Sequence, residues 1–171
     1  MTWIRAHFQR YRERKPWDFC WRISIEGLLV ALVFAIPLMF LGLSLREIKV
    51  SFPILLFSAV VVAPVLETFI FQAFPVWIAR LCKARFSVQV AASVIPFFLA
   101  HATIAGVGSG IAAGLISGFY LAFTYVHWRE QKRWTAFWTT AVSHAIHNGI
   151  LMILLAFVPE EIGSHGRPPV P

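Results

Sequence analysis

Five polar side chains lie within otherwise apolar stretches of this sequence: Glu67, His101, His144, His147 and Asn148. An ionisable group at membrane depth is costly, so it is usually paired, cavity-facing or functional. A carboxylate held away from bulk water is a stronger base than one in water. Imidazole and amide groups can hold a water molecule and stabilise a developing oxyanion. These residue types are therefore suited to the hydrolysis of an amide bond.

The spacing of these residues groups them on helical faces. His144 and Asn148 are four residues apart, so they share one face of a helix. His147 points about 60° away from His144, and we expect it to make a helix–helix hydrogen bond instead. Phe97 stands four residues before His101, where it can pack beneath the imidazole. The spacing therefore favours His144 over His147 as a site residue.

The elements that carry these residues are predicted to be membrane-spanning helices. The chain is 58% hydrophobic and only 13% charged, whereas a soluble domain averages about a quarter charged residues. A spanning helix needs about 20 mostly apolar residues, and five stretches qualify: 23–45, 52–79, 86–103, 107–128 and 134–158. The sequence therefore predicts an all-α, polytopic transmembrane helix bundle of about five spans.

Two of these spans contain helix-modifying residues. Three prolines are expected to bend the second span: Pro53, Pro64 and Pro75. Four glycines recur every fourth residue in the region of the fourth span: Gly106, Gly110, Gly114 and Gly118. Such a stripe lets helices approach closely. Close packing within the bundle is the favoured interpretation, and a dimer contact or a substrate groove is the alternative.

Basic residues cluster on one side of the predicted bundle. Of the 15, 12 lie in the N-terminal segment and in the loops after the second and fourth spans. The positive-inside rule then places the N-terminus in the cytoplasm. We expect an integral protein of a bacterial inner membrane, in contact with the lipid bilayer. The net charge of +7 is thus a topology signal, and no nucleic-acid partner is expected.

The chain divides into a basic N-terminal segment at 1–22, a transmembrane domain at 23–158 and a C-terminal tail at 159–171. Residues 2–15 fit an interfacial amphipathic helix, with a frayed basic tail as the alternative. At about 1.5 Å per residue, Glu67, His101, His144 and Asn148 lie roughly 15–22 Å above the inner face. Since polar groups avoid lipid by finding each other, we expect these four to cluster.

The three polar segments also occur in a known order. Glu-Thr-Phe-Ile-Phe-Gln at 67–72 precedes Phe97-Phe-Leu-Ala-His101 and then His144-Ala-Ile-His-Asn148. This order resembles the CPBP family, the CAAX prenyl proteases and bacteriocin-processing proteins also called Abi. Its members carry Glu-Glu-x-x-x-Arg, then Phe-x-x-x-His, then His-x-x-x-Asn or Asp. The resemblance covers about 52–158 and implies an intramembrane endopeptidase whose substrate is a membrane-associated protein or peptide.

The resemblance also implies roles for individual residues. Glu67 matches the glutamate that activates water, and His101 matches the histidine of the second motif. His144 and Asn148 match the third motif. We assign the two histidines to orienting water or transferring protons, and Asn148 to donating a hydrogen bond to the oxyanion.

The first motif departs from the family at two supporting positions. Thr68 stands where the family has its second glutamate, and Gln72 where it has arginine. These positions are four apart, so a neutral Thr–Gln contact would replace an ion pair along the helix. Both charges are lost together, which keeps the local charge balance.

Two alternatives remain open at this point. A divalent metal such as zinc could be held by Glu67, His101 and His144, although His-Glu-x-x-His is missing and two histidines are few for such a site. We therefore favour a site that needs no metal or other cofactor. A non-catalytic membrane immunity or interaction protein on the same fold is the second functional hypothesis. A transporter is disfavoured because no hydrophilic stripe runs the length of a span. The oligomeric state is not predicted.

Overall fold

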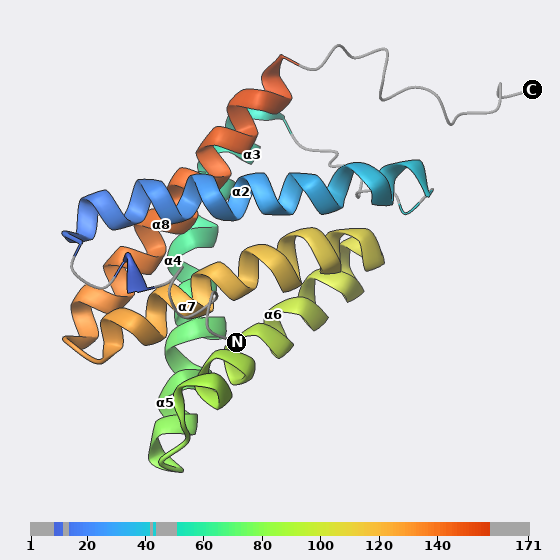
Figure 1. Cartoon of the computed structure of the whole chain (residues 1–171). Helices are drawn as coiled ribbons and strands as arrows, with labels where there is room; N and C mark the ends of the chain where they lie inside the picture. Colours follow the sequence, from blue (N-terminus) through green and yellow to red (C-terminus); the bar gives the residue numbers. More distant parts are fainter. Residues whose placement is uncertain (1–8, 12–13, 42, 44–50, 158–171) are drawn as a thin grey trace, which may run out of the picture.

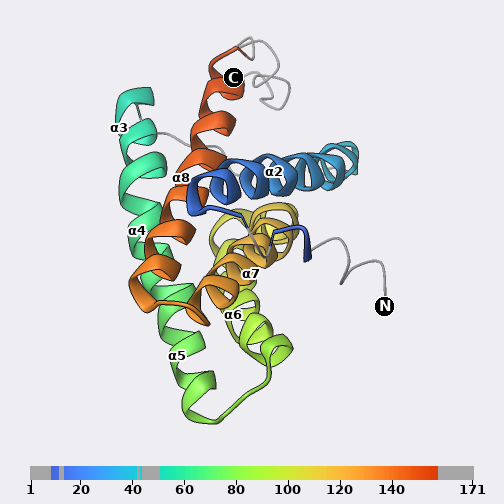
Figure 2. The ribbon, with the colours of Figure 1, turned by 60° about the vertical axis from the view of Figure 1, so that its left-hand side comes forward.

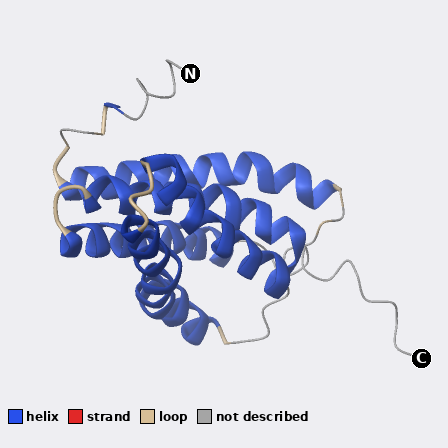
Figure 3. Cartoon of the chain, turned by 90° about the horizontal axis from the view of Figure 1, so that it is seen from below, coloured by secondary structure: helices blue, strands red, loops and turns tan. Residues whose placement is uncertain are grey.

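The computed structural model describes residues 9–11, 14–41, 43 and 51–157, and helices are the only regular elements in that part of the chain (Figure 1, Figure 3). Within it, four helices are long and apolar enough to cross a membrane: Pro16–Leu38, Phe52–Leu81, Phe86–Arg129 and Arg133–Ala156. This confirms the predicted all-α helical bundle of a membrane protein. The expected 159–171 tail and most of the 2–15 segment lie outside the described residues.

The first helix, α2 (Pro16–Phe40), begins earlier than the predicted span. Proline is favoured at the first helical position because its fixed φ suits the helix and its missing N–H would have no partner there. Asp18 in the first turn then pairs with Arg14 at 2.5 Å and with Arg22 at 2.7 Å, each four residues away. The proline and these ion pairs thus favour a helix before residue 23, where the predicted apolar span begins.

The second long helix contains two widened turns. Its segments are α3 (Phe52–Phe57), η1 (Ser58–Val62), α4 (Ala63–Glu67), η2 (Thr68–Ala73) and α5 (Phe74–Leu81). The π-helical segments η1 and η2 end two residues before Pro64 and Pro75 respectively. Proline has no N–H to donate and its ring crowds the carbonyl four residues back, so the turn before it opens. Glu67 is the last residue before the second widened turn.

The third and fourth predicted spans form a single hairpin. The segments α6 (Phe86–Ser109), η3 (Gly110–Ser117) and α7 (Gly118–Arg129) follow without a loop, but Gly106 has φ 87° and ψ 166°. A straight helix of 44 residues would be about 66 Å long, far more than a bilayer core. The chain instead reverses at Gly106, and η3 and α7 return along α6 (Figure 1).

The glycine stripe packs within this hairpin, as favoured from the sequence. A β-carbon on Gly110 would lie 2.6 Å from Ala102 Cβ, and one on Gly114 would lie 2.6 Å from Phe98 Cα. Gly118 faces Phe97 in the same way. Gly106 does not belong to the stripe, contrary to the prediction. Its positive φ makes the reversal itself, a conformation that side chains with a β-carbon rarely adopt.

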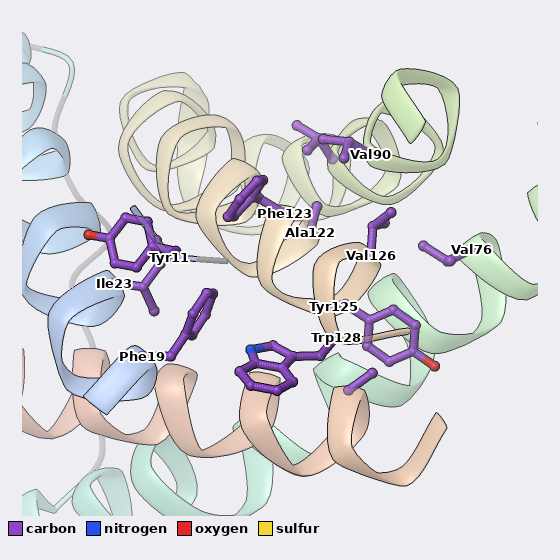
Figure 4. Packing of buried hydrophobic residues seen from close by; sticks show 12 residues of the cluster. Tyr11, Phe19, Ile23, Val76, Val90, Ala122, Phe123, Tyr125, Val126 and Trp128 are labelled. Carbon is purple, nitrogen blue, oxygen red and sulfur yellow. The ribbon is translucent and has the colours of Figure 1, made fainter. Parts of the chain in front are cut away.

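The last helix, α8 (Arg133–Ala156), packs against α2, α7 and the α3–α5 helix (Figure 2). The buried apolar cluster joins the N-terminal Tyr11 to α2, α5, α6, α7 and α8 (Figure 4). Tyr11 also donates a hydrogen bond to Glu26 at 2.5 Å, and Arg10 pairs with the same carboxylate. Glu26 therefore links the N-terminal segment to α2.

Candidate active site

Glu67 and His144 meet between two helices. Glu67 ends α4, His144 lies mid-way along α8, and Glu67 Oε2 is 3.8 Å from His144 Nε2. The His144 side chain is 7% exposed and that of Glu67 27%. The carboxylate is thus the member of the pair closer to the outside of the bundle. A polar contact longer than 3.5 Å is commonly bridged by a water molecule.

His101 lies against the same aromatic ring as His144. The Phe97 ring is 2% exposed, and its centroid is 4.4 Å from that of His101 and 6.2 Å from that of His144. The predicted packing of Phe97 on His101 is therefore present, and Phe97 touches both histidines. Phe71, which the sequence did not single out, packs edge-on against Phe97 at 5.2 Å. Phe71 lies inside the 67–72 segment, four residues after Glu67, but its contact with Phe97 is between two helices, which spacing along one helix does not show.

The tautomer of His101 follows from its hydrogen bond. Its Nδ1 lies 3.0 Å from the carbonyl oxygen of Phe97, one helical turn earlier. A carbonyl oxygen can only accept, so Nδ1 carries the hydrogen and, in the neutral ring, Nε2 is the acceptor. His101 can therefore accept a proton or a water hydrogen at Nε2.

Glycines bring the hairpin close enough to fix this arrangement. A β-carbon on Gly118 would lie 2.6 Å from Phe97 Cδ1, and one on Gly114 would lie 3.2 Å from His101 Cβ. Real β-carbons do not approach other atoms as closely as 2.6 Å. The glycine stripe thus sets how deeply the Phe97 and His101 side chains can sit between α6 and the returning arm.

Asn148 connects α8 to the wide turn η1. Its Nδ2 donates a 2.8 Å hydrogen bond to the Ala59 carbonyl, and a β-carbon on the neighbouring Gly149 would lie 4.0 Å from Val60 Cγ2. The Asn148 amide has a second N–H and a carbonyl oxygen. Asn148 lies one turn from His144 on α8, so it lies near the pair while one of its hydrogens is used to join the helices.

Thr68 and Gln72 are fully buried, and the described residues provide no hydrogen-bond partner for the Thr68 hydroxyl or for either polar atom of the Gln72 amide. The neutral contact expected between them is therefore not a hydrogen bond. The widened turn η2 spans both positions, so the four-residue spacing no longer has the geometry of an ordinary α-helix.

The alternative zinc set of Glu67, His101 and His144 is not assembled here. In the described residues there is no group of three or more His, Cys, Asp and Glu side chains arranged to hold a metal ion. Glu67 and His144 are close, and His101 is linked to His144 through the Phe97 ring, which contacts both histidines.

His147 makes the helix–helix contact expected of it. Its Nε2 is 3.3 Å from the Ser117 hydroxyl on η3, which confirms the prediction. Ser24 on α2 donates to the Ser143 carbonyl at 2.8 Å in the same region. These serines line a cavity of about 10 Å³ with His147. The sequence feature that indicates this cluster is the presence of small polar residues within apolar spans, because such residues commonly join helices.

Comparison with protein-family models, with curated proteins and with solved structures finds no match to this chain.

Proposed function

We propose that this protein is an intramembrane endopeptidase in which Glu67 activates the water that attacks a peptide bond. The observation that carries the proposal is the 3.8 Å approach of Glu67 Oε2 to His144 Nε2 from two separate apolar helices. A half-buried carboxylate within an apolar span is a costly way to join helices, since hydrogen bonds between spans average only about 0.6 kcal/mol.

The separation of the two atoms suits a shared water. A water about 2.8 Å from both atoms would hold them at an angle of about 85°, and a separation of about 4.6 Å would give the tetrahedral angle. If the separation of the two atoms increased by about 0.8 Å, a water molecule could therefore bridge them with tetrahedral geometry. Side-chain rotation of Glu67, the more exposed partner, can supply it.

The proposed reaction uses the chain's own groups. Glu67 takes a proton from the water as its oxygen attacks the peptide carbonyl, and the carbonyl becomes an oxyanion. The second N–H of Asn148 and a ring N–H of His144 stabilise that oxyanion. Protonated Glu67 then gives its proton to the leaving nitrogen as the C–N bond breaks. His101 Nε2 orients the water as a hydrogen-bond acceptor.

The order of the three motifs supports the same proposal. Glu67, then Phe97 with His101, then His144 with Asn148 resemble the CPBP proteases. By the same reasoning the protein lies in a bacterial inner membrane with its N-terminus in the cytoplasm, as the distribution of basic residues favours. The substrate class is a membrane-associated protein or peptide that reaches the carboxylate from within the bilayer.

Cleavage of a fluorogenic peptide library by the protein in proteoliposomes tests the proposal. Glu67→Gln should lower kcat by about 10²–10⁴, the range of a lost general base. Glu130→Gln, which changes an exposed glutamate beyond the end of α7, should leave kcat unchanged. Equal cleavage by wild type and Glu67→Gln would remove the proposal.

A non-catalytic membrane interaction protein is the second candidate. It is favoured by the two neutral, fully buried residues Thr68 and Gln72 at the family's charged positions. Full biological function in a strain that carries Glu67→Ala would support this candidate against the protease.

A further inference from the structure

A small cavity lies where α2, the η3–α7 arm and α8 pack together. Its volume is about 10 Å³, and a cavity needs roughly 10–15 Å³ to hold one water molecule. Most of the residues that line it are polar, and each of the three elements contributes hydroxyl groups, from Ser24, Ser117, Thr124 and Ser143. The cavity therefore has room for one water molecule and is too small for an organic ligand.

The Ser143 hydroxyl is an independent reason to expect a ligand in this cavity. Ser143 is 2% exposed, and its Oγ has no hydrogen-bond partner among the described residues. The Cys20 thiol lies near this hydroxyl, but the thiol donates to the Thr139 carbonyl and its sulfur accepts only weakly. A buried hydroxyl without a good partner is costly, so a ligand that accepts its hydrogen would stabilise the bundle.

The other three hydroxyls of the wall are available as hydrogen-bond acceptors. Each already donates its hydrogen to a backbone carbonyl, at 2.8 Å for Ser24, 3.2 Å for Ser117 and 2.8 Å for Thr124. A hydroxyl oxygen also has two lone pairs with which it can accept. The wall therefore offers one hydrogen, from Ser143, and several acceptor oxygens, which is the complement of a water molecule.

We propose that this cavity is a binding site for one ordered water molecule, which joins α2, the η3–α7 arm and α8. The water accepts a hydrogen bond from Ser143 Oγ and donates its two hydrogens to hydroxyl oxygens of the wall. Buried waters typically make about three hydrogen bonds, whereas cavities that stay empty are lined by apolar side chains. Helices in lipid associate through packing and polar contacts rather than through the hydrophobic effect, so the water is a link between three helices.

An experimental density map of the full-length protein, at a resolution that shows ordered waters, tests the site directly. We expect density for a single water at about 2.5–3.0 Å from Ser143 Oγ, the range of a hydrogen bond between two oxygens. The same water should lie within that range of at least one other hydroxyl oxygen of the wall. An empty cavity in a map that shows other buried waters would overturn the proposal.

Two matched serine variants test the same site by thermal unfolding of the protein in detergent. Ser143→Ala removes the group that donates to the water and should lower Tm by about 2–4 °C, the effect of one lost hydrogen bond. Ser93 on α6 is the control, because its hydroxyl is also fully buried without a partner among the described residues, but it does not line this cavity. Ser93→Ala should leave Tm unchanged or raise it, since it removes an unpaired polar group. Equal changes in Tm for the two variants would contradict a water bound at Ser143.

A comparison of salts distinguishes water from a small cation, the other occupant that hydroxyl oxygens can hold. A water site predicts the same Tm in sodium chloride and in choline chloride at equal concentration. A ligand that binds only the folded protein raises Tm with its concentration. A Tm that rises with sodium in the wild type, but not in Ser143→Ala, would overturn the water and assign the cavity to sodium.

Discussion

Gly118 faces the ring of Phe97 so closely that a β-carbon at position 118 would lie 2.6 Å from Phe97 Cδ1. The glycine on α7 therefore limits where the ring can lie, and the ring in turn contacts His101 and His144. A residue that takes no part in the proposed chemistry thus helps to position two that do.

Gly118→Ala should displace Phe97 and destabilise the bundle by about 1–3 kcal/mol, as overpacking in a core does. It should also lower kcat, because both histidines move with the ring. Gly149→Ala is the matched control, since a β-carbon there meets only Val60 at 4.0 Å. Thermal unfolding of both variants checks this, and an equal Tm for the two would contradict the close packing.

Asn148→Ala should lower kcat by about 10²–10³, as the loss of an oxyanion donor does, with little change in KM. The variant also loses the hydrogen bond to Ala59. Thr103→Val provides a comparison, because within the described part of the chain the Thr103 hydroxyl bonds only to carbonyls of its own helix. A rise in KM with kcat unchanged would show that Asn148 only joins α8 to η1.

Gln72→Leu should be neutral or stabilising. Both polar atoms of the Gln72 amide are buried without a hydrogen-bond partner among the described residues, and removing an unpaired buried polar group relieves its desolvation cost. Tm of the variant measures the effect. Destabilisation by more than about 1 kcal/mol would mean that a bound water satisfies the amide.

His101 should be in the tautomer that carries its hydrogen on Nδ1, because the Phe97 carbonyl accepts from that nitrogen. Nitrogen-15 NMR of selectively labelled histidine, assigned by comparison with His101→Gln, identifies the protonated nitrogen. A hydrogen on Nε2 would leave His101 without the acceptor that the proposed mechanism needs.

The apolar pattern predicted the helices because lipid leaves a spanning chain little choice but to satisfy its own backbone. It also placed the third and fourth spans at 86–103 and 107–128, and the chain reverses between them, at Gly106. It did not predict that one residue with a positive φ makes this turn without a loop. The early start of α2 depends on Pro16 and on ion pairs of Asp18, which hydropathy does not register.

The sequence could predict which residues of the candidate site lie at the same depth in the membrane. Glu67 and His144 were expected at similar heights, and they lie 3.8 Å apart. Contacts that depend on rotation about the helix axis were not predictable. Thr68 and Gln72 face the interior without bonding to each other, and His127 near the end of α7 stacks on Phe19 and Phe123.

The most direct test of the central claim is a double-mutant cycle on kcat for peptide cleavage, with Glu67→Gln, His144→Gln and the double variant. Residues that hold one water act as a unit, so the double variant should be no slower than the slower single variant within about threefold. Losses that multiply would mean that Glu67 and His144 act separately, and would contradict a shared water.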